Sequence, residues 1–135
     1  MEKIRWSKKY SSGLIYLDNH RRNFIDIINE LIDVCSSGTS GTRLPMVFHR
    51  LAFYVEDYFT MKELAIRDSP SLPFMEYKKE HQRFAAEISR FQDRYRLGDP
   101  GVCEQMVDFL VNWFENYIRI FGPEAAAYMK TKGYE

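Results

Sequence analysis

A set of histidine, tyrosine and lysine side chains has the spacing of a site inside a helical protein. Tyr58 and Lys62 are four residues apart, and so are Tyr77 and His81. Residues four apart lie on the same face of a helix, so each pair can point into one interior. Helical bundles build metal sites from such side chains on facing helices. The residues that we expect to meet at mid-height of the core are His20, Tyr58, Lys62, Tyr77, His81 and Tyr117.

Lys62 is the unusual member of this set. The helical face on which it lies also carries Leu51, Tyr54 and Ala65. A lysine among core residues costs free energy unless it is paired, neutral or able to reach solvent. The position therefore indicates either an unusual function or one that has been lost.

Hydrophobic periodicity predicts that four long helices carry these side chains. We expect Asp18 and Asp99 to be N-caps and Pro100 to occupy the first helical position after Asp99. In order, the expected segments are an irregular arm (1–16), helix 18–35, a loop (36–41), helix 42 to 67 or 68, helix 72–97, helix 100–121 and a short helix 123–129.

The pattern is all-α and favours one domain, 1–135, folded as an up-down-up-down antiparallel four-helix bundle with an N-terminal arm and a short C-terminal helix. The 19 basic and 19 acidic residues balance, which gives no excess charge for nucleic acid. No run approaches the roughly 20 apolar residues that a membrane span needs, and the first residues have no secretory apolar core.

The sequence contains two cysteines, Cys35 and Cys103. Two are too few for a disulfide scaffold, so we expect reduced thiols and a cytoplasmic location. The alternative is a redox-responsive disulfide, because the end of the first helix and the start of the fourth lie at the same end of such a bundle. That bond would need Cα atoms within about 7 Å.

Several segments resemble the bacterial hemerythrins over nearly the whole chain. They are Trp6, the run 13–22 (Gly-Leu-Ile-Tyr-Leu-Asp-Asn-His-Arg-Arg), the run 28–31 (Ile-Asn-Glu-Leu), and Trp113 followed four residues later by Tyr117. The resemblance implies a four-helix bundle. It also implies a pair of irons held by five histidines and two bridging carboxylates, which bind dioxygen reversibly.

Residue by residue, the resemblance fails at the metal ligands. Only His20 and His81 stand as histidines at ligand positions. Lys62 stands where the family has a bridging glutamate, and Gly122 where it has a bridging aspartate. Glu63 does not replace the lost glutamate, because one residue is about 100° around a helix. Tyrosine replaces the remaining ligand histidines, at Tyr58, Tyr77 and Tyr117.

We therefore expect no di-iron centre and no cofactor. In the preferred interpretation the tyrosines fill the vacated cavity and hydrogen-bond to the histidines, and Lys62 donates to phenol oxygens. The alternative is a rebuilt site for a single iron or an oxygen species, because phenolate oxygen suits ferric iron. Its ligands would be His20, His81, Tyr58, Tyr77 and Tyr117.

The second and fourth helices carry apolar stripes beside their core faces. These stripes suggest that the protein acts by binding another protein at its surface. Either the arm and the terminal helix cover them, or they dock a second copy or a protein partner. No nucleophile, phosphate loop or cofactor motif indicates an enzyme, and His49 is expected at the surface. A non-enzymatic role in protein interaction or signalling follows. The stripe residues are Phe48, Ala52, Val55, Phe59, Ile66, Val107, Val111, Phe114 and Ile118.

Overall fold

The computed structural model describes residues 1–38 and 40–135, and these residues form helices and no strand. The long helix that was expected over 42–68 contains a π-helical segment between two α-helices. The elements in order are η1 (Lys8–Tyr10), α1 (Ile15–Ser36), α2 (Ser40–Tyr54), η2 (Val55–Phe59, the π-helical segment), α3 (Thr60–Ile66), α4 (Phe74–Arg96), α5 (Val102–Ile120) and α6 (Gly122–Thr131).

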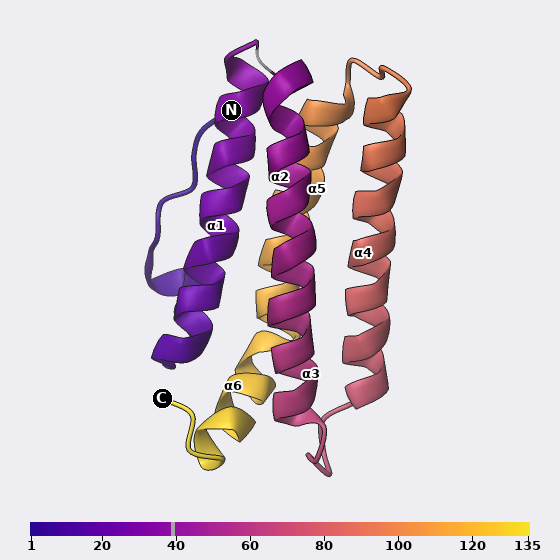
Figure 1. Ribbon diagram of the computed structural model, residues 1–135. Helices are drawn as coiled ribbons and strands as arrows, with labels where there is room; N and C mark the ends of the chain where they lie inside the picture. The colour runs from indigo at the N-terminus through magenta and orange to yellow at the C-terminus, as the bar shows by residue number, and fades with distance from the viewer. Residues whose placement is uncertain (39) are drawn as a thin grey trace.

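The helices pack as a bundle around one main apolar core (Figure 1). Helix α1 contacts α2 and α5, and α4 contacts the same two helices. Helix α6 contacts α3 and α5 at the end of the bundle where α1 begins (Figure 1). No helix among the described residues is both long and apolar enough to cross a membrane.

The N-terminal arm lies along α1, as the sequence predicted. The side-chain amide of Asn29 exchanges hydrogen bonds with both the backbone N–H and the carbonyl of Ile4, at 2.8 and 2.9 Å. The Arg22 guanidinium lies 4.1 Å from the centre of the Trp6 ring. These contacts hold the arm against the outside of the first helix.

Both predicted N-caps are wrong, because the helices are capped by Leu14 and Gly101 and not by Asp18 and Asp99. Helix α1 begins at Ile15, so Asp18 lies inside it, where its carboxylate accepts hydrogen bonds from Ser11 and Ser12 of the arm. Helix α5 begins at Val102, and Asp99 instead accepts a hydrogen bond from the Gly101 N–H at 2.9 Å. An aspartate carboxylate accepts hydrogen bonds from backbone N–H groups in turns as readily as at the start of a helix. Sequence alone does not distinguish the two cases.

The expected loop at 36–41 is shorter in the structure. Helix α1 extends to Ser36 and α2 begins at Ser40, and residue 39 lies outside the described residues. The third helix and the terminal helix lie close to their predicted ranges. The buried side chains of α4 fall at helical spacing, and the expected Tyr77 and His81 are among them. They are Tyr77, His81, Phe84, Ile88 and Phe91.

Most of the apolar stripe on the second and fourth helices is buried within this chain. Phe48, Phe59 and Ile66 are buried, as are Val107 and Phe114. The arm supplies part of the cover, since the Tyr10 ring stacks on the Phe114 ring at 5.7 Å. The explanation by internal cover therefore holds for these residues.

Ile120 follows Trp113 and Tyr117 at helical spacing, but unlike them it is exposed, at 57%. It is the last residue of α5. The inward position passes to Phe121, whose ring contacts those of Tyr77 at 4.7 Å and Tyr117 at 5.3 Å. The chain turns into α6 at this point, so helical spacing no longer predicts which side is buried.

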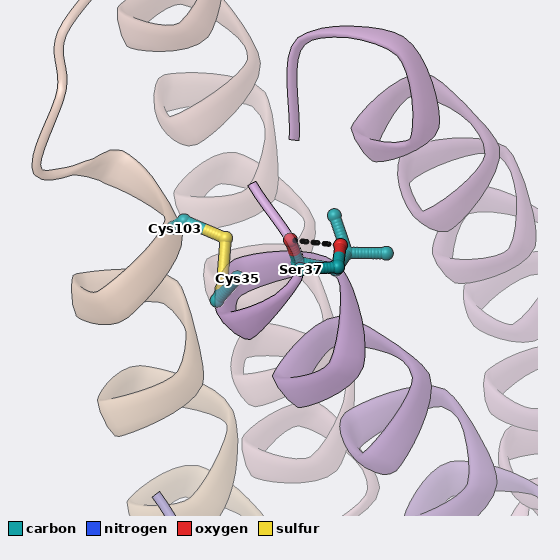
Figure 2. Close-up of a disulfide and its surroundings, with 4 residues drawn as sticks. Cys35, Ser37 and Cys103 are labelled. Atoms are coloured by element: carbon teal, nitrogen blue, oxygen red, sulfur yellow. Dashed lines mark hydrogen bonds between the residues drawn. A yellow bond between two sulfur atoms is a disulfide. The ribbon is translucent and has the colours of Figure 1, made fainter. Parts of the chain in front are cut away.

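Cys35 and Cys103 form a disulfide, so the expectation of free thiols was wrong (Figure 2). The bond joins the last turn of α1 to the first turn of α5, with 5.7 Å between the Cα atoms. This separation is within the range that a disulfide requires. The placement of both cysteines at one end of the bundle is confirmed.

Candidate functional site

Lys62 lies at the centre of the predicted site and is completely buried. Within the part of the chain that the structure describes, its Nζ has no hydrogen-bond partner. The amine lies 5.5 Å from the centre of the Tyr117 ring and 5.8 Å from that of Tyr58. Burial, reinforced by the positive charge of Arg21, lowers the pKa of Lys62 from 10.5 to about 7. The expected donation to phenol oxygens is not among its contacts.

Arg21 is a second buried cation beside this site, and the sequence analysis did not single it out. Its guanidinium donates from Nη1 to the Tyr10 carbonyl at 2.7 Å, and its Nε has no partner among the described residues. A Cβ atom at Gly122 would lie only 2.8 Å from Nη2. The guanidinium therefore fills the space next to Gly122.

A sequence signal for Arg21 did exist. Core residues of α1 recur at alternating steps of three and four, which is the spacing of a helix face packed in a bundle. Arg21 falls within that series, whereas His20 does not. The buried members of the series are Leu14, Leu17, Arg21, Phe24, Ile28 and Leu31.

His81 is the centre of a hydrogen-bonded chain of three side chains. Its Nε2 lies 2.7 Å from the Tyr117 hydroxyl, and its Nδ1 lies 2.8 Å from a Glu63 carboxylate oxygen. The Phe59 ring stacks on the imidazole at 4.0 Å. Burial lowers the pKa of His81, although the hydrogen bond and charge of Glu63 oppose this. The neutral tautomer that satisfies both contacts donates from Nδ1 to Glu63 and accepts from Tyr117 at Nε2.

The contact with Glu63 corrects the expectation that this residue points elsewhere. The π-helical segment Val55–Phe59 places an extra residue in the turn just before α3. Such a segment changes the direction in which the following side chains point, and π-helical turns are frequent at functional sites. The sequence carries no clear signal for this segment. The assumption of a regular α-helix therefore predicted the wrong direction for the Glu63 side chain.

The other predicted residues do not share one set of contacts. His20 is half-buried, and its ring packs against those of Tyr58 at 4.8 Å and Tyr16 at 5.2 Å. The Tyr77 hydroxyl donates to the Phe121 carbonyl at 2.9 Å. Burial raises the pKa of Tyr58 and of Tyr77 to about 12. These phenols remain protonated at neutral pH and do not present phenolate oxygens to a common point.

His49 is exposed, as expected. It lines a small cleft of about 240 Å³ between α1 and α2 that His20 also lines. Together the two histidines make a surface feature outside the core.

The side chains around Lys62 and His81 do not fit a di-iron centre. Across residues 1–38 and 40–135, no three histidine, cysteine, aspartate or glutamate side chains are grouped so that they could hold a metal ion. Both ring nitrogens of His81 are already engaged, and the two basic side chains of Lys62 and Arg21 are buried nearby. Iron needs several N/O ligands in a defined geometry, and a site of this charge works against cation binding.

Comparison with known proteins supports a hemerythrin-like relationship. The chain is 24% identical over 119 residues to bacteriohemerythrins of Pseudomonas aeruginosa (strains LESB58 and UCBPP-PA14) and Pseudomonas paraeruginosa (strain DSM 24068 / PA7). Each alignment covers 88% of this chain and 76% of the relative. No family model matches the chain. The all-helical bundle is consistent with this relationship.

Proposed function

We propose that this chain is a single hemerythrin-like domain with up-down-up-down four-helix topology. In this proposal it has lost di-iron and reversible oxygen binding and acts without catalysis, through protein interaction or signalling. The observation that carries the proposal is the buried amine of Lys62, which has no hydrogen-bond partner among the described residues and belongs to the residue that the resemblance aligns with a bridging glutamate.

The surroundings of Lys62 favour a core in which its side chain takes the place of metal ions and does not bind next to them. Its amine is packed between aromatic rings, and desolvation favours its neutral form near pH 7. A divalent ion next to it would favour the neutral amine further, but it would still lack the anionic bridge that offsets the charge of two metals. The positive charge of the nearby Arg21 guanidinium adds to the repulsion.

The aromatic packing supports a stable core without metal. Phe24, Phe59 and Phe84 pack against the Trp113 ring at 5.7, 5.6 and 4.4 Å. Trp113 also donates from Nε1 to the Glu80 carboxylate at 2.8 Å. A core with this much interlocking aromatic surface is stabilised by burial and ring contacts and does not depend on coordination bonds.

An interaction surface on the second and fourth helices is part of the proposal. Phe53 of α2 is 69% exposed, and Met46 of α2 and Leu64 of α3 are also exposed. Ile120 adds an exposed apolar side chain at the end of α5. A protein partner or a second copy of this chain would cover these residues. A cytoplasmic location requires the disulfide to be redox-sensitive, because the cytosol keeps most thiols reduced.

Metal analysis tests this function directly. The protein is purified from iron-supplemented cells without chelators, and its iron and zinc contents are measured by mass spectrometry beside its absorption spectrum. We expect less than a tenth of one metal per chain and no visible band. Near-stoichiometric metal would overturn the proposal.

The single-iron alternative has its own outcome in the same experiment. It requires a visible band from tyrosinate-to-iron charge transfer that is lost in Tyr58→Phe. Tyr95→Phe, a change on another part of α4, is the matched control and would leave such a band intact.

A further inference from the structure

A second site of different chemistry lies outside the core, where the arm, the end of α5 and α6 meet. These elements enclose a cleft of about 690 Å³. Figure 1 shows α6 at the end of the bundle, close to the start of α1. A cleft of this size matches those that hold small organic ligands.

The cleft is lined by an excess of positive charge. Lys9, Arg21, Arg119 and Lys130 contribute four basic side chains, and Glu115 contributes the one carboxylate among the lining residues. That carboxylate lies 3.5 Å from the Lys9 amine. Three basic groups on the wall therefore have no acidic partner within the cleft, which favours an anionic ligand.

Arg21 forms the innermost part of this wall and has an incomplete set of contacts. The residue is only 4% exposed, and no carboxylate pairs with it among the described residues. Asp18 is close enough to feel its charge, but the Asp18 oxygens accept hydrogen bonds from Ser11 and Ser12. Burying a guanidinium without a counter-charge is costly. An anion in the cleft would supply the missing partner.

Gly122 leaves the guanidinium in contact with the cleft. It lines the cleft, and a Cβ atom at this position would lie 2.8 Å from Arg21 Nη2. The absence of a side chain here leaves room for the guanidinium itself, with Nη2 against Gly122 at the cleft wall. Because Nη1 already donates to the Tyr10 carbonyl, a carboxylate in the cleft would accept mainly from Nη2.

Ser11 and Ser12 of the arm also line the cleft, and a further part of its wall is apolar. This apolar part comes from the end of the arm, the last turn of α5 and one face of α6: Leu14, Ile118, Pro123, Ala126 and Ala127. A ligand that only carried charge would leave this surface uncovered. The cleft suits a molecule with an anionic head and an apolar body.

We propose that this cleft binds a small organic carboxylate whose head pairs with Arg21 and whose apolar body lies between α5 and α6. The site is separate from the core at Lys62 and His81, and it stands whether or not the core holds metal. Arg119 and Lys130, at the exposed rim, attract the anion.

Isothermal titration calorimetry with sodium octanoate as the probe tests the proposal on the full chain. We expect saturable binding of one octanoate per chain, no comparable binding of neutral 1-octanol, and a much weaker signal from inorganic phosphate. Arg21→Gln is expected to weaken octanoate binding by roughly tenfold or more, since it removes a charged hydrogen-bonding partner.

Gly122→Asp is the decisive variant, because it places a carboxylate beside the Arg21 fork. We expect it to abolish octanoate binding, because its Cβ displaces the guanidinium and its carboxylate takes the place of the anion. It also keeps the test valid if Arg21→Gln fails to fold. Lys132→Gln removes an exposed charge from the same end of the chain but outside the cleft and should bind octanoate as the wild type does.

Three results would overturn the proposal. The first is no binding of octanoate, or unchanged binding in Gly122→Asp. The second is equal binding of 1-octanol, which would mean that Arg21 contributes nothing. The third is equal binding of phosphate, which would mean that the apolar wall contributes nothing.

Discussion

Replacing Lys62 by methionine should raise the free energy of unfolding near neutral pH. It should also remove much of the change in that free energy between pH 7 and pH 10.5. Methionine has a similar length and fills the same apolar space without an amine that lacks a partner. In the unfolded chain the lysine titrates near 10.5, and in the folded protein burial lowers its pKa to about 7. Each pKa unit corresponds to about 1.4 kcal/mol, so the penalty near pH 7 is on the order of 4 kcal/mol.

The sign of the pH effect follows from proton binding. Between pH 7 and 10.5 the unfolded state holds a proton on Lys62 that the folded state lacks. The free energy of unfolding of the wild type should therefore rise with pH in this window, by about 1.4 kcal/mol per pH unit from this residue. Below pH 7 both states are protonated, and the full cost of burying the charge remains.

Urea denaturation at pH 7, 8 and 9, with the disulfide kept oxidised, measures the effect. The difference between the wild type and Lys62→Met should shrink by about 2–3 kcal/mol across these two pH units. Other titrating groups cancel in this difference. Lys78→Met, a change of the same type at an exposed position of α4, should show no such trend. A constant difference for Lys62→Met would refute the assignment of a buried neutral amine.

Three further predictions concern the other contacts. Tyr117→Phe removes the hydroxyl that His81 Nε2 contacts and should lower the free energy of unfolding by about 1–3 kcal/mol; a loss below that range in urea denaturation would contradict the hydrogen bond. Glu63→Gln removes the carboxylate that raises the pKa of His81, so an NMR titration of the ring should show a lower pKa, and an unchanged value would contradict the contact. Replacing Cys35 and Cys103 together by serine opens a link across 68 residues and should cost about 2–4 kcal/mol; equal stability to the oxidised wild type would show that the bond is not formed in solution.

The sequence by itself determined the helical class and much of the core. Side chains at helical spacing on α4 are buried as predicted, and His81 and Tyr117 come from different helices to meet in the interior. The local pattern is sufficient here, because a helix has a fixed period and its apolar face must be covered. The expected up-down topology also placed the two cysteines at one end of the bundle. The prediction that their thiols are reduced was wrong.

The surroundings of each polar group were decided by the tertiary structure. Arg21 lies on the periodic face of α1, but only the approach of α6 and the absence of a Cβ at Gly122 explain where its guanidinium goes. Glu63 reaches His81 because a π-helical segment precedes it, and one extra residue in a turn leaves no mark in composition. Apolar burial depends on average periodicity, whereas hydrogen bonds, ion pairs and the disulfide depend on distances of a few ångströms. Those distances are set only when all the helices have packed.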